Sequence, residues 1–351
     1  MKKFLALLLA LVMVFALVAC GNDEPAPVES QDPAPEQSQE PAGPDPIKIV
    51  FATPNADANI ESEYAQKWIA AVEEASGGNI TFDYTNSGAL GTYDELLEGT
   101  INGTYDMTIT EPSYIAPYVP ESALLSLPML YSSYEEADWI LDGEVGQWYN
   151  DLCRAQGMEI LNYFYCGFRY IISQDKITSL ADCDGVIIRS PSIQTYLDTL
   201  QMLGFKCETM AFSEAYTAME TGVISAVECP LQNLYSSGYQ NMCDYLLGSR
   251  HLLSANCIVA NEDFWAGLPE EYKEILTTAI ADITAEERVE CAAREQQFLD
   301  DFAAAGTEFN DFDADSMAKI VEMFTEYWTT ALTDTAPEAL PMLEKIVAHK
   351  G

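Results

Sequence analysis

Basic residues are scarce in this chain of 351 residues. There are 16 Lys and Arg against 56 Asp and Glu, which gives a formal net charge of −40 at pH 7. Nucleic acid is not an expected partner, because its phosphate backbone attracts proteins with clustered Lys and Arg. The chain has only six arginines, so an arginine at the edge of a predicted pocket calls for a specific explanation.

Histidines and catalytic motifs are also scarce. The two histidines are His251 and His349, and the second lies almost at the C-terminus. The sequence lacks the serine-hydrolase elbow, the zinc-protease helix motif and the glycine-rich loops that bind phosphates or dinucleotides. The nine cysteines include no C-x-x-C pair, so a zinc site is not expected. Disulfide pairing and buried free thiols both remain open for these cysteines. We therefore expect neither an enzyme nor a cofactor.

The N-terminus has the pattern of an export signal. Lys2 and Lys3 precede a run of Leu, Ala and Val that is too short for a lasting transmembrane helix, so residues 1–19 are predicted to be a signal peptide. The sequence LVACG, residues 17–21, resembles the bacterial lipoprotein cleavage box, in which the cysteine is lipidated. This resemblance implies lipidation of Cys20 and anchoring to the outer face of the cytoplasmic membrane. An ordinary secretory signal is the alternative.

Residues 20–46 are predicted to form a tether. Residues 21–46 hold seven prolines and seven acidic residues but no Lys or Arg. Such a segment cannot bury a hydrophobic core and repels itself, so we expect it to be extended and disordered. The folded part of the chain is predicted to begin at Ile47.

The most informative stretch is residues 181–237. The pattern predicts strands at 186–188, 205–209 and 223–227, with helices at 193–203 and 213–222 between them. Alternating strands and helices indicate crossover units and a parallel sheet, in which ligands bind beyond the carboxyl ends of the strands. Arg189 and the triplet Glu228-Cys229-Pro230 are predicted to follow two of these strands. The sequence thus indicates a ligand site at this edge.

Two motifs in this stretch carry a family resemblance. GVIIRSP and MAFSEAYTAMETGVISAVECPLQNLYSS resemble GLKIRVP and MAFSEVYTALQTGVVDGQENPLSNIYSS, segments of the solute-binding receptors of tripartite ATP-independent periplasmic (TRAP) transporters. At least fourteen positions of the second motif match in register. NEDFWAGLP further along the chain resembles the family's N-x-x-x-W-x-x-L-P segment, and the resemblance covers about residues 47–335.

The resemblance implies an α/β, two-domain fold like that of periplasmic binding proteins, with a central ligand cleft and a long helix that spans both domains. Domain I is expected to comprise residues 47–166 and 257–294, and domain II residues 167–256 and 295–351. The long helix is expected from Pro269 to about Ala305. The implied partners are a small organic acid and the integral membrane subunits of a TRAP transporter.

The resemblance also implies roles for individual residues. In the family, the arginine at the position of Arg189 binds the carboxylate of the solute, and Arg169 matches a second arginine near it. A guanidinium offers a planar fork that suits both carboxylate oxygens. For both arginines, a structural ion pair is the alternative. The sequence departs from the family at Cys229, because family members usually carry an asparagine there, and a thiol is a weak donor and acceptor.

Five further residues are candidate contacts for the ligand. Phe212 matches an aromatic residue that packs over the solute, and Glu111 follows a predicted strand end. Thr53, Asn55 and Thr92 lie on predicted loops that face the same cleft. Structural roles in the core, in solvent or in a loop are the alternatives for these side chains.

Three other functions remain open on sequence alone. An ABC-type substrate-binding lipoprotein would have a similar two-domain shape but other membrane partners. A lipid-anchored hydrolase or a sensory receptor that binds the same ligand are further alternatives. The identity of the solute is not determined by the sequence.

Overall fold

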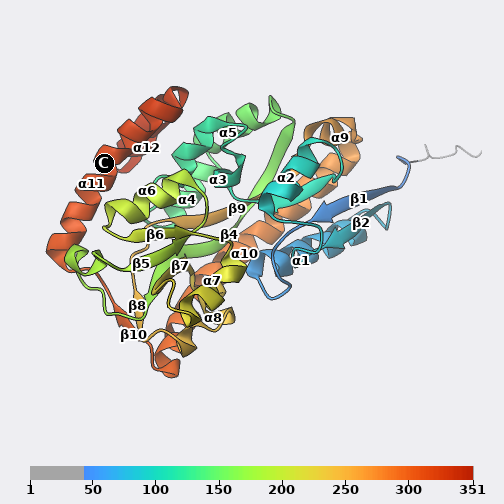
Figure 1. The fold of residues 1–351 in the computed structure, drawn as a ribbon. Helices are drawn as coiled ribbons and strands as arrows, with labels where there is room; N and C mark the ends of the chain where they lie inside the picture. The colour runs from blue at the N-terminus through green and yellow to red at the C-terminus, as the bar shows by residue number, and fades with distance from the viewer. Residues whose placement is uncertain (1–42, 351) are drawn as a thin grey trace, which may run out of the picture. The chain divides into compact units, whose positions relative to one another are not determined.

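The computed structural model describes residues 43–350 (Figure 1). The predicted signal peptide, the lipidation site at Cys20 and nearly all of the tether lie outside the described residues. Among the residues that are described, no helix has the length and apolar character needed to cross a bilayer.

The first part of the sheet is built from the N-terminal strands. The order β2-β1-β3-β9 places β1 (Ile47–Ala52) between β2 (Ile80–Thr85) and β3 (Met107–Thr110), parallel to both. Strand β9 (Leu253–Asn261) then adds to β3 in the antiparallel direction. All nine residues of β9 are buried, as expected of a central strand covered on both faces.

Strand β4 (Met158–Ser173) joins the two parts of the sheet. Its first two-thirds pair with β9, and its last residues pair with β7 and β8. The register shifts between Tyr165 and Gly167, where the extra residue of a bulge bends a strand. The sequence pattern predicts a strand over residues 159–165, and its predicted end at Tyr165 is wrong, because the chain continues through the bulge as one strand. Arg169 therefore lies within β4 and not after it.

The second part of the sheet contains the strands predicted within residues 181–237. Strand β5 (Ile187–Ser190) lies between β6 (Lys206–Thr209) and β7 (Ala226–Pro230) and is parallel to both, as predicted. However, β7 pairs antiparallel with β4, so the whole sheet is mixed. Glu228, Cys229 and Pro230 were predicted to follow the strand. They belong to it, because they form ladder pairs with Ile171, Tyr170 and Arg169.

The helix α10 (Glu270–Ala305) packs against both β4 and α1 (Ile60–Ala75). Figure 1 shows it in orange, passing behind β4. It begins after Pro269 and ends at Gly306, which has a φ of 98°. Glycine adopts this left-handed conformation without a steric penalty, so it ends the helix as predicted.

The remaining elements cover the faces of the sheet or extend its edge. A short parallel pair, β8 with β10, and the C-terminal helix α12 were not predicted from the sequence. Their bounds, with those of the other helices, are α2 Tyr93–Ile101, α3 Pro112–Ile115, α4 Tyr134–Leu141, α5 Glu144–Arg154, α6 Gln194–Met202, α7 Phe212–Glu220, α8 Leu231–Ser236, β8 Tyr245–Leu247, α9 Glu262–Gly267, β10 Glu308–Asn310, α11 Ala314–Thr335 and α12 Leu340–Lys350.

Residues 43–350 contain two hydrophobic clusters. The larger includes Phe51, Trp68 and Phe164 and extends along β4 and α10. The smaller includes Ile188 and Phe324 and packs under the second part of the sheet. Burying one such large side chain stabilises a fold by about 1.5–3 kcal/mol, so each cluster supports its own part of the sheet. The eight described cysteines are free thiols.

Candidate functional site

Arg189 is a buried cation with few protein partners. It is 5% exposed, its Nε donates to the backbone oxygen of Met210 at 3.0 Å, and its guanidinium carbon lies 5.5 Å from the ring centre of Phe212. No carboxylate of residues 43–350 lies within ion-pair distance of it, although every other described arginine has one. Burying an unpaired charge is unfavourable, so this guanidinium is suited to an anionic ligand.

Arg169 has the opposite environment. Its Nε and Nη2 donate to Glu228 Oε2 and Oε1 at 2.5 and 2.8 Å, and its Nη1 donates to Ser254 Oγ at 2.7 Å. Burial alone would raise the pKa of Glu228, but the charge and hydrogen bonds of Arg169 lower it to about 2. His251 Nε2 lies 3.4 Å from the same carboxylate. The guanidinium is thus held rigidly by an ion pair within the protein.

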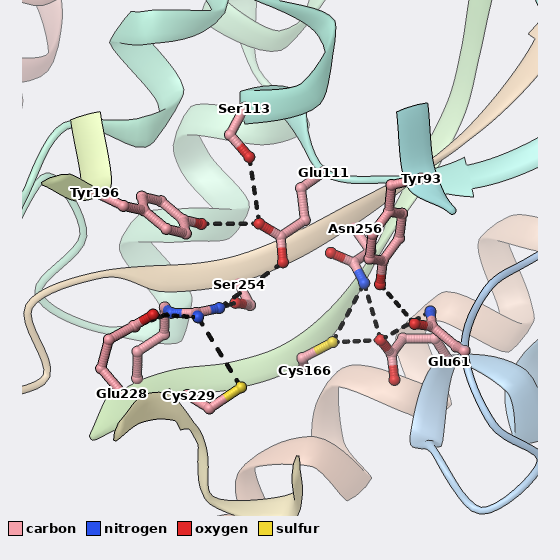
Figure 2. A network of polar contacts seen from close by, with 12 residues as sticks. Glu61, Tyr93, Glu111, Ser113, Cys166, Tyr196, Glu228, Cys229, Ser254 and Asn256 are labelled. Atoms are coloured by element: carbon pink, nitrogen blue, oxygen red, sulfur yellow. Dashed lines mark hydrogen bonds and ion pairs between the residues drawn. The ribbon is translucent and has the colours of Figure 1, made fainter. Parts of the chain in front are cut away.

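Glu111 connects this pair to the first part of the sheet. It directly follows β3, as predicted, and its Oε1 lies 3.8 Å from Arg169 Nη1. Its Oε2 accepts hydrogen bonds from the hydroxyls of Tyr196 at 2.8 Å and Ser113 at 3.3 Å (Figure 2). Elements from both parts of the sheet therefore converge on one carboxylate.

Cys229 lies beside Arg169. Its Sγ is 3.9 Å from Arg169 Nη2, and the residue is 6% exposed. Burial raises the pKa of this thiol to about 12, in spite of the opposing charges of Arg169 and Arg189. The thiol is therefore neutral at physiological pH and provides a compact, weakly polar wall.

Glu61 is a site residue that the sequence reasoning missed. It lies in the first turn of α1 and is 1% exposed. Its Oε1 accepts from Asn55 Nδ2 at 3.2 Å, from Asn256 Nδ2 at 2.8 Å and from the thiol of Cys166 (Figure 2). A signal was available, because an acidic residue opens the helix that follows the carboxyl end of β1, where ligands gather in such sheets.

Two stacked tyrosines join the surroundings of Glu61 to those of the arginines. The ring centres of Tyr93 and Tyr114 are 4.9 Å apart, and the Tyr93 hydroxyl donates to Asn55 Oδ1 at 2.5 Å. Burial raises the pKa of Tyr114, whereas the charges of Arg189 and Arg169 act to lower it. Tyr114 thus lies within electrostatic range of both guanidinium groups.

The predicted site residues fall into three groups. Arg169, Glu111 and Cys229 lie together, Arg189 lies beside Phe212, and Asn55 lies beside Glu61. Thr92 is exposed, and its hydroxyl caps α2 in a reciprocal arrangement with Glu95. Thr53 Oγ1 accepts from the backbone of Asn55 at 3.3 Å. A binding role for Thr92 and Thr53 stays a prediction.

The family model for bacterial extracellular solute-binding proteins, family 7, matches residues 51–334. The chain belongs to this family. A TRAP periplasmic solute-binding protein from Roseobacter denitrificans, solved with L-galactonate, superposes with a TM-score of 0.75 at 26% identity, covering 86% of this chain and 99% of that chain. The recognition of a TRAP solute-binding receptor from the sequence is thereby confirmed.

Two further relatives of this TRAP receptor have named solutes. The sugar acid binding protein from Advenella mimigardefordensis, solved with galactonate, has a TM-score of 0.81 at 25% identity, covering 88% of this chain and 99% of that chain. The 2,3-diketo-L-gulonate-binding periplasmic protein of Escherichia coli is 26% identical over 245 residues, which is 70% of this chain and 75% of that protein. The predicted two-domain α/β fold is that of these receptors.

Proposed function

We propose that this TRAP receptor captures a small organic acid by pairing the carboxylate of the solute with Arg189. The buried guanidinium of Arg189, which no carboxylate of residues 43–350 neutralises, is the observation that carries this proposal. Its Nη1 and Nη2 groups present the fork that binds both oxygens of a carboxylate. Hydrogen bonds to charged groups contribute about 1.5–3 kcal/mol each, which is enough to select an acid over a neutral analogue.

The other predicted site residues have supporting roles in this proposal. Phe212 covers the ligand beside Arg189, and Cys229 leaves more room than the asparagine usual in the family. Glu111 and Asn55 offer acceptors to the hydroxyls or amine of the solute, with Thr92 at the rim. Arg169 adds positive potential, but its pairing with Glu228 makes it a fixed element of the wall and a weaker anion partner than Arg189.

Capture is proposed to couple to domain closure. The predicted domain I, residues 47–166 and 257–294, would carry Glu61 and Glu111. The predicted domain II, residues 167–256 and 295–351, would carry both arginines. A solute that contacts both groups favours the closed state, because those contacts exist only when the domains meet. The closed receptor would then deliver its solute to the integral membrane subunits.

The location is proposed to follow from Cys20. Cleavage before this cysteine and its lipidation would anchor the receptor to the outer face of the cytoplasmic membrane. A single acyl chain binds membranes only marginally, whereas a multiply acylated N-terminal cysteine gives stable attachment. The tether of residues 21–46 would extend up to roughly 80 Å, at about 3.1 Å per residue, which leaves the folded part free to move between membrane subunits.

A thermal-shift screen tests the proposed function. Purified protein, freed of bound ligand by mild unfolding and refolding, is screened against sugar acids, dicarboxylates, keto acids and amino acids. A solute of this class should raise the melting temperature in proportion to the logarithm of its concentration, because binding to the folded state stabilises it. Arg189→Ala should abolish the shift. A neutral sugar that shifts parent and variant equally would contradict the proposal.

A further inference from the structure

Glu61 has one carboxylate oxygen that no protein group satisfies. Its Oε1 accepts from two amides and a thiol, whereas Oε2 is buried without a hydrogen-bond partner among residues 43–350. Asn256, which is 1% exposed, hydrogen-bonds to Glu61 and has a second such acceptor. Its Oδ1 is buried and accepts from no group of residues 43–350. A buried acceptor without a donor keeps the full cost of its desolvation, so a ligand group that donates to it would be stabilising.

No cation of the described chain neutralises Glu61. No Lys, Arg or His of residues 43–350 lies within ion-pair distance of it, although a half-buried neighbour on the same helix, Glu63, pairs with Lys67 and Arg294. Burial raises the pKa of Glu61, and the nearby charge of Glu111 acts in the same direction. A positive group next to Oε2 would relieve this penalty, because an opposite charge favours the ionised form.

Binding of a solute carboxylate would leave the negative charges of the site in excess of its two arginines. The two buried cations, Arg169 and Arg189, face three carboxylates: Glu228, Glu111 and Glu61. Glu228 neutralises Arg169, and a solute carboxylate would neutralise Arg189. Two carboxylates then remain: Glu111, which lies 3.8 Å from the already paired Arg169, and Glu61, which has no cation. A monoanionic solute without a cation adds its charge to this excess, whereas a zwitterion adds none.

We propose that the solute is a zwitterion, whose carboxylate pairs with Arg189 and whose ammonium group is bound by Glu61 Oε2 with Asn256 Oδ1. This inference rests on the proposed function, because it needs Arg189 to bind the acid group. The charge of Glu111 also acts on Glu61 and adds negative potential there. An ammonium group supplies three hydrogen-bond donors and one positive charge. Glu61 Oε2 and Asn256 Oδ1 have no donor within the described chain, and Glu61 has no counter-charge. The substrate class is then an amino acid or amino acid derivative.

Matched ligand pairs test this inference by isothermal titration calorimetry at pH 7. Each amino acid of a panel is compared with the 2-hydroxy acid of the same carbon skeleton, for example glutamate with 2-hydroxyglutarate, and sugar acids are added as a third set. The expected result is a Kd at least tenfold lower for an amino acid than for its hydroxy acid. This comparison uses the parent protein and so does not depend on the folding of any variant.

The variant Glu61→Gln then locates the preference. The amide keeps an acceptor for Asn55 and Asn256 but removes the negative charge, so the tenfold preference should fall to less than about threefold. Glu286→Gln is the matched control, since Glu286 is an exposed acid 60% accessible on α10, and it should leave the preference unchanged. A preference that survives Glu61→Gln would overturn the assignment of the ammonium to Glu61.

The remaining outcomes separate the inference from the function on which it rests. If a sugar acid or hydroxy acid binds best, the zwitterion is wrong, while the Arg189-dependent capture of an organic acid stands. If an amine without a carboxylate binds as tightly as the amino acid and is insensitive to Arg189→Ala, the proposed function itself is wrong. If no carboxylate binds at all, both fail.

Discussion

Arg169 and Glu228 form a two-contact ion pair in which the side chains are 5% and 1% exposed. The two residues are 59 positions apart in the chain and meet because β4 and β7 are antiparallel neighbours. Ser254 accepts from the same guanidinium, and His251 Nε2 lies 3.4 Å from Glu228 Oε2. The charged groups of this cluster are neutralised by one another, so we expect the cluster to act mainly on stability and on the position of Arg169.

Glu228→Gln should therefore destabilise the protein strongly. Removing one charge of a buried pair leaves the other uncompensated, and the expected loss is about 3–5 kcal/mol in the free energy of unfolding, measured by urea denaturation. Glu308→Gln is the control, because Glu308 pairs with Lys176 at the surface, where a pair contributes about 0–1 kcal/mol. Equal losses in the two variants would show that the buried pair of Arg169 and Glu228 contributes no more to stability than a surface ion pair.

The same pair predicts how stability depends on acid. Burial raises the pKa of Glu228, yet Arg169 lowers it to about 2, below the value of about 4.3 expected in the unfolded chain. A depressed pKa stabilises the folded state above the unfolded pKa, and this stability is lost as the pH falls from about 5 towards 2. The contribution is about 3 kcal/mol at pH 7.

Urea titrations of the parent and of Glu228→Gln between pH 7 and pH 3 measure this term. The difference in the free energy of unfolding should shrink as the pH falls, because the parent loses what the variant lacks. Using the difference removes the effects of the many other carboxylates. A constant difference across this range would show that Glu228 is not ionised in the folded protein.

Arg189→Lys should weaken solute binding without unfolding the protein. Lysine keeps the positive charge but cannot form the two-pronged contact, so we expect Kd to rise about tenfold, equivalent to about 1.4 kcal/mol. Titration calorimetry with the best solute of the screen measures the change. Arg154→Lys, at a partly exposed ion pair with Asp151, should leave Kd unaltered. An unaltered Kd in Arg189→Lys would remove Arg189 from the site.

Cys20→Ser should release the receptor from the membrane. Without the thiol there is no atom for the acyl chain, so the chain should no longer incorporate labelled palmitate and should move to the soluble fraction of expressing cells. Cys207→Ser, a substitution in the folded part, is the control, and this variant should remain membrane-bound. Membrane attachment that is unchanged in Cys20→Ser would refute the lipoprotein prediction.

Much of the local structure could be predicted because its causes lie close together in sequence. Pro269 and Gly306 bound α10, and the alternation of residues 181–237 predicted β5, α6, β6 and α7 with ends correct to within two or so residues. The resemblance of the motif around Arg189 to the TRAP receptors could also be recognised from the sequence. Each of these features depends on turn chemistry, apolar periodicity or a contiguous motif.

Only the tertiary structure decided which charges are paired. Arg169 and Arg189 look alike in sequence, but β4 brings Arg169 against Glu228, while no carboxylate of residues 43–350 approaches Arg189. Glu61 reads as a surface residue of an amphipathic helix until α1 is packed against Asn256 and Cys166. The physical reason is that burial and strand pairing join residues distant along the chain, and these contacts determine whether a charge is neutralised within the protein or left for a ligand.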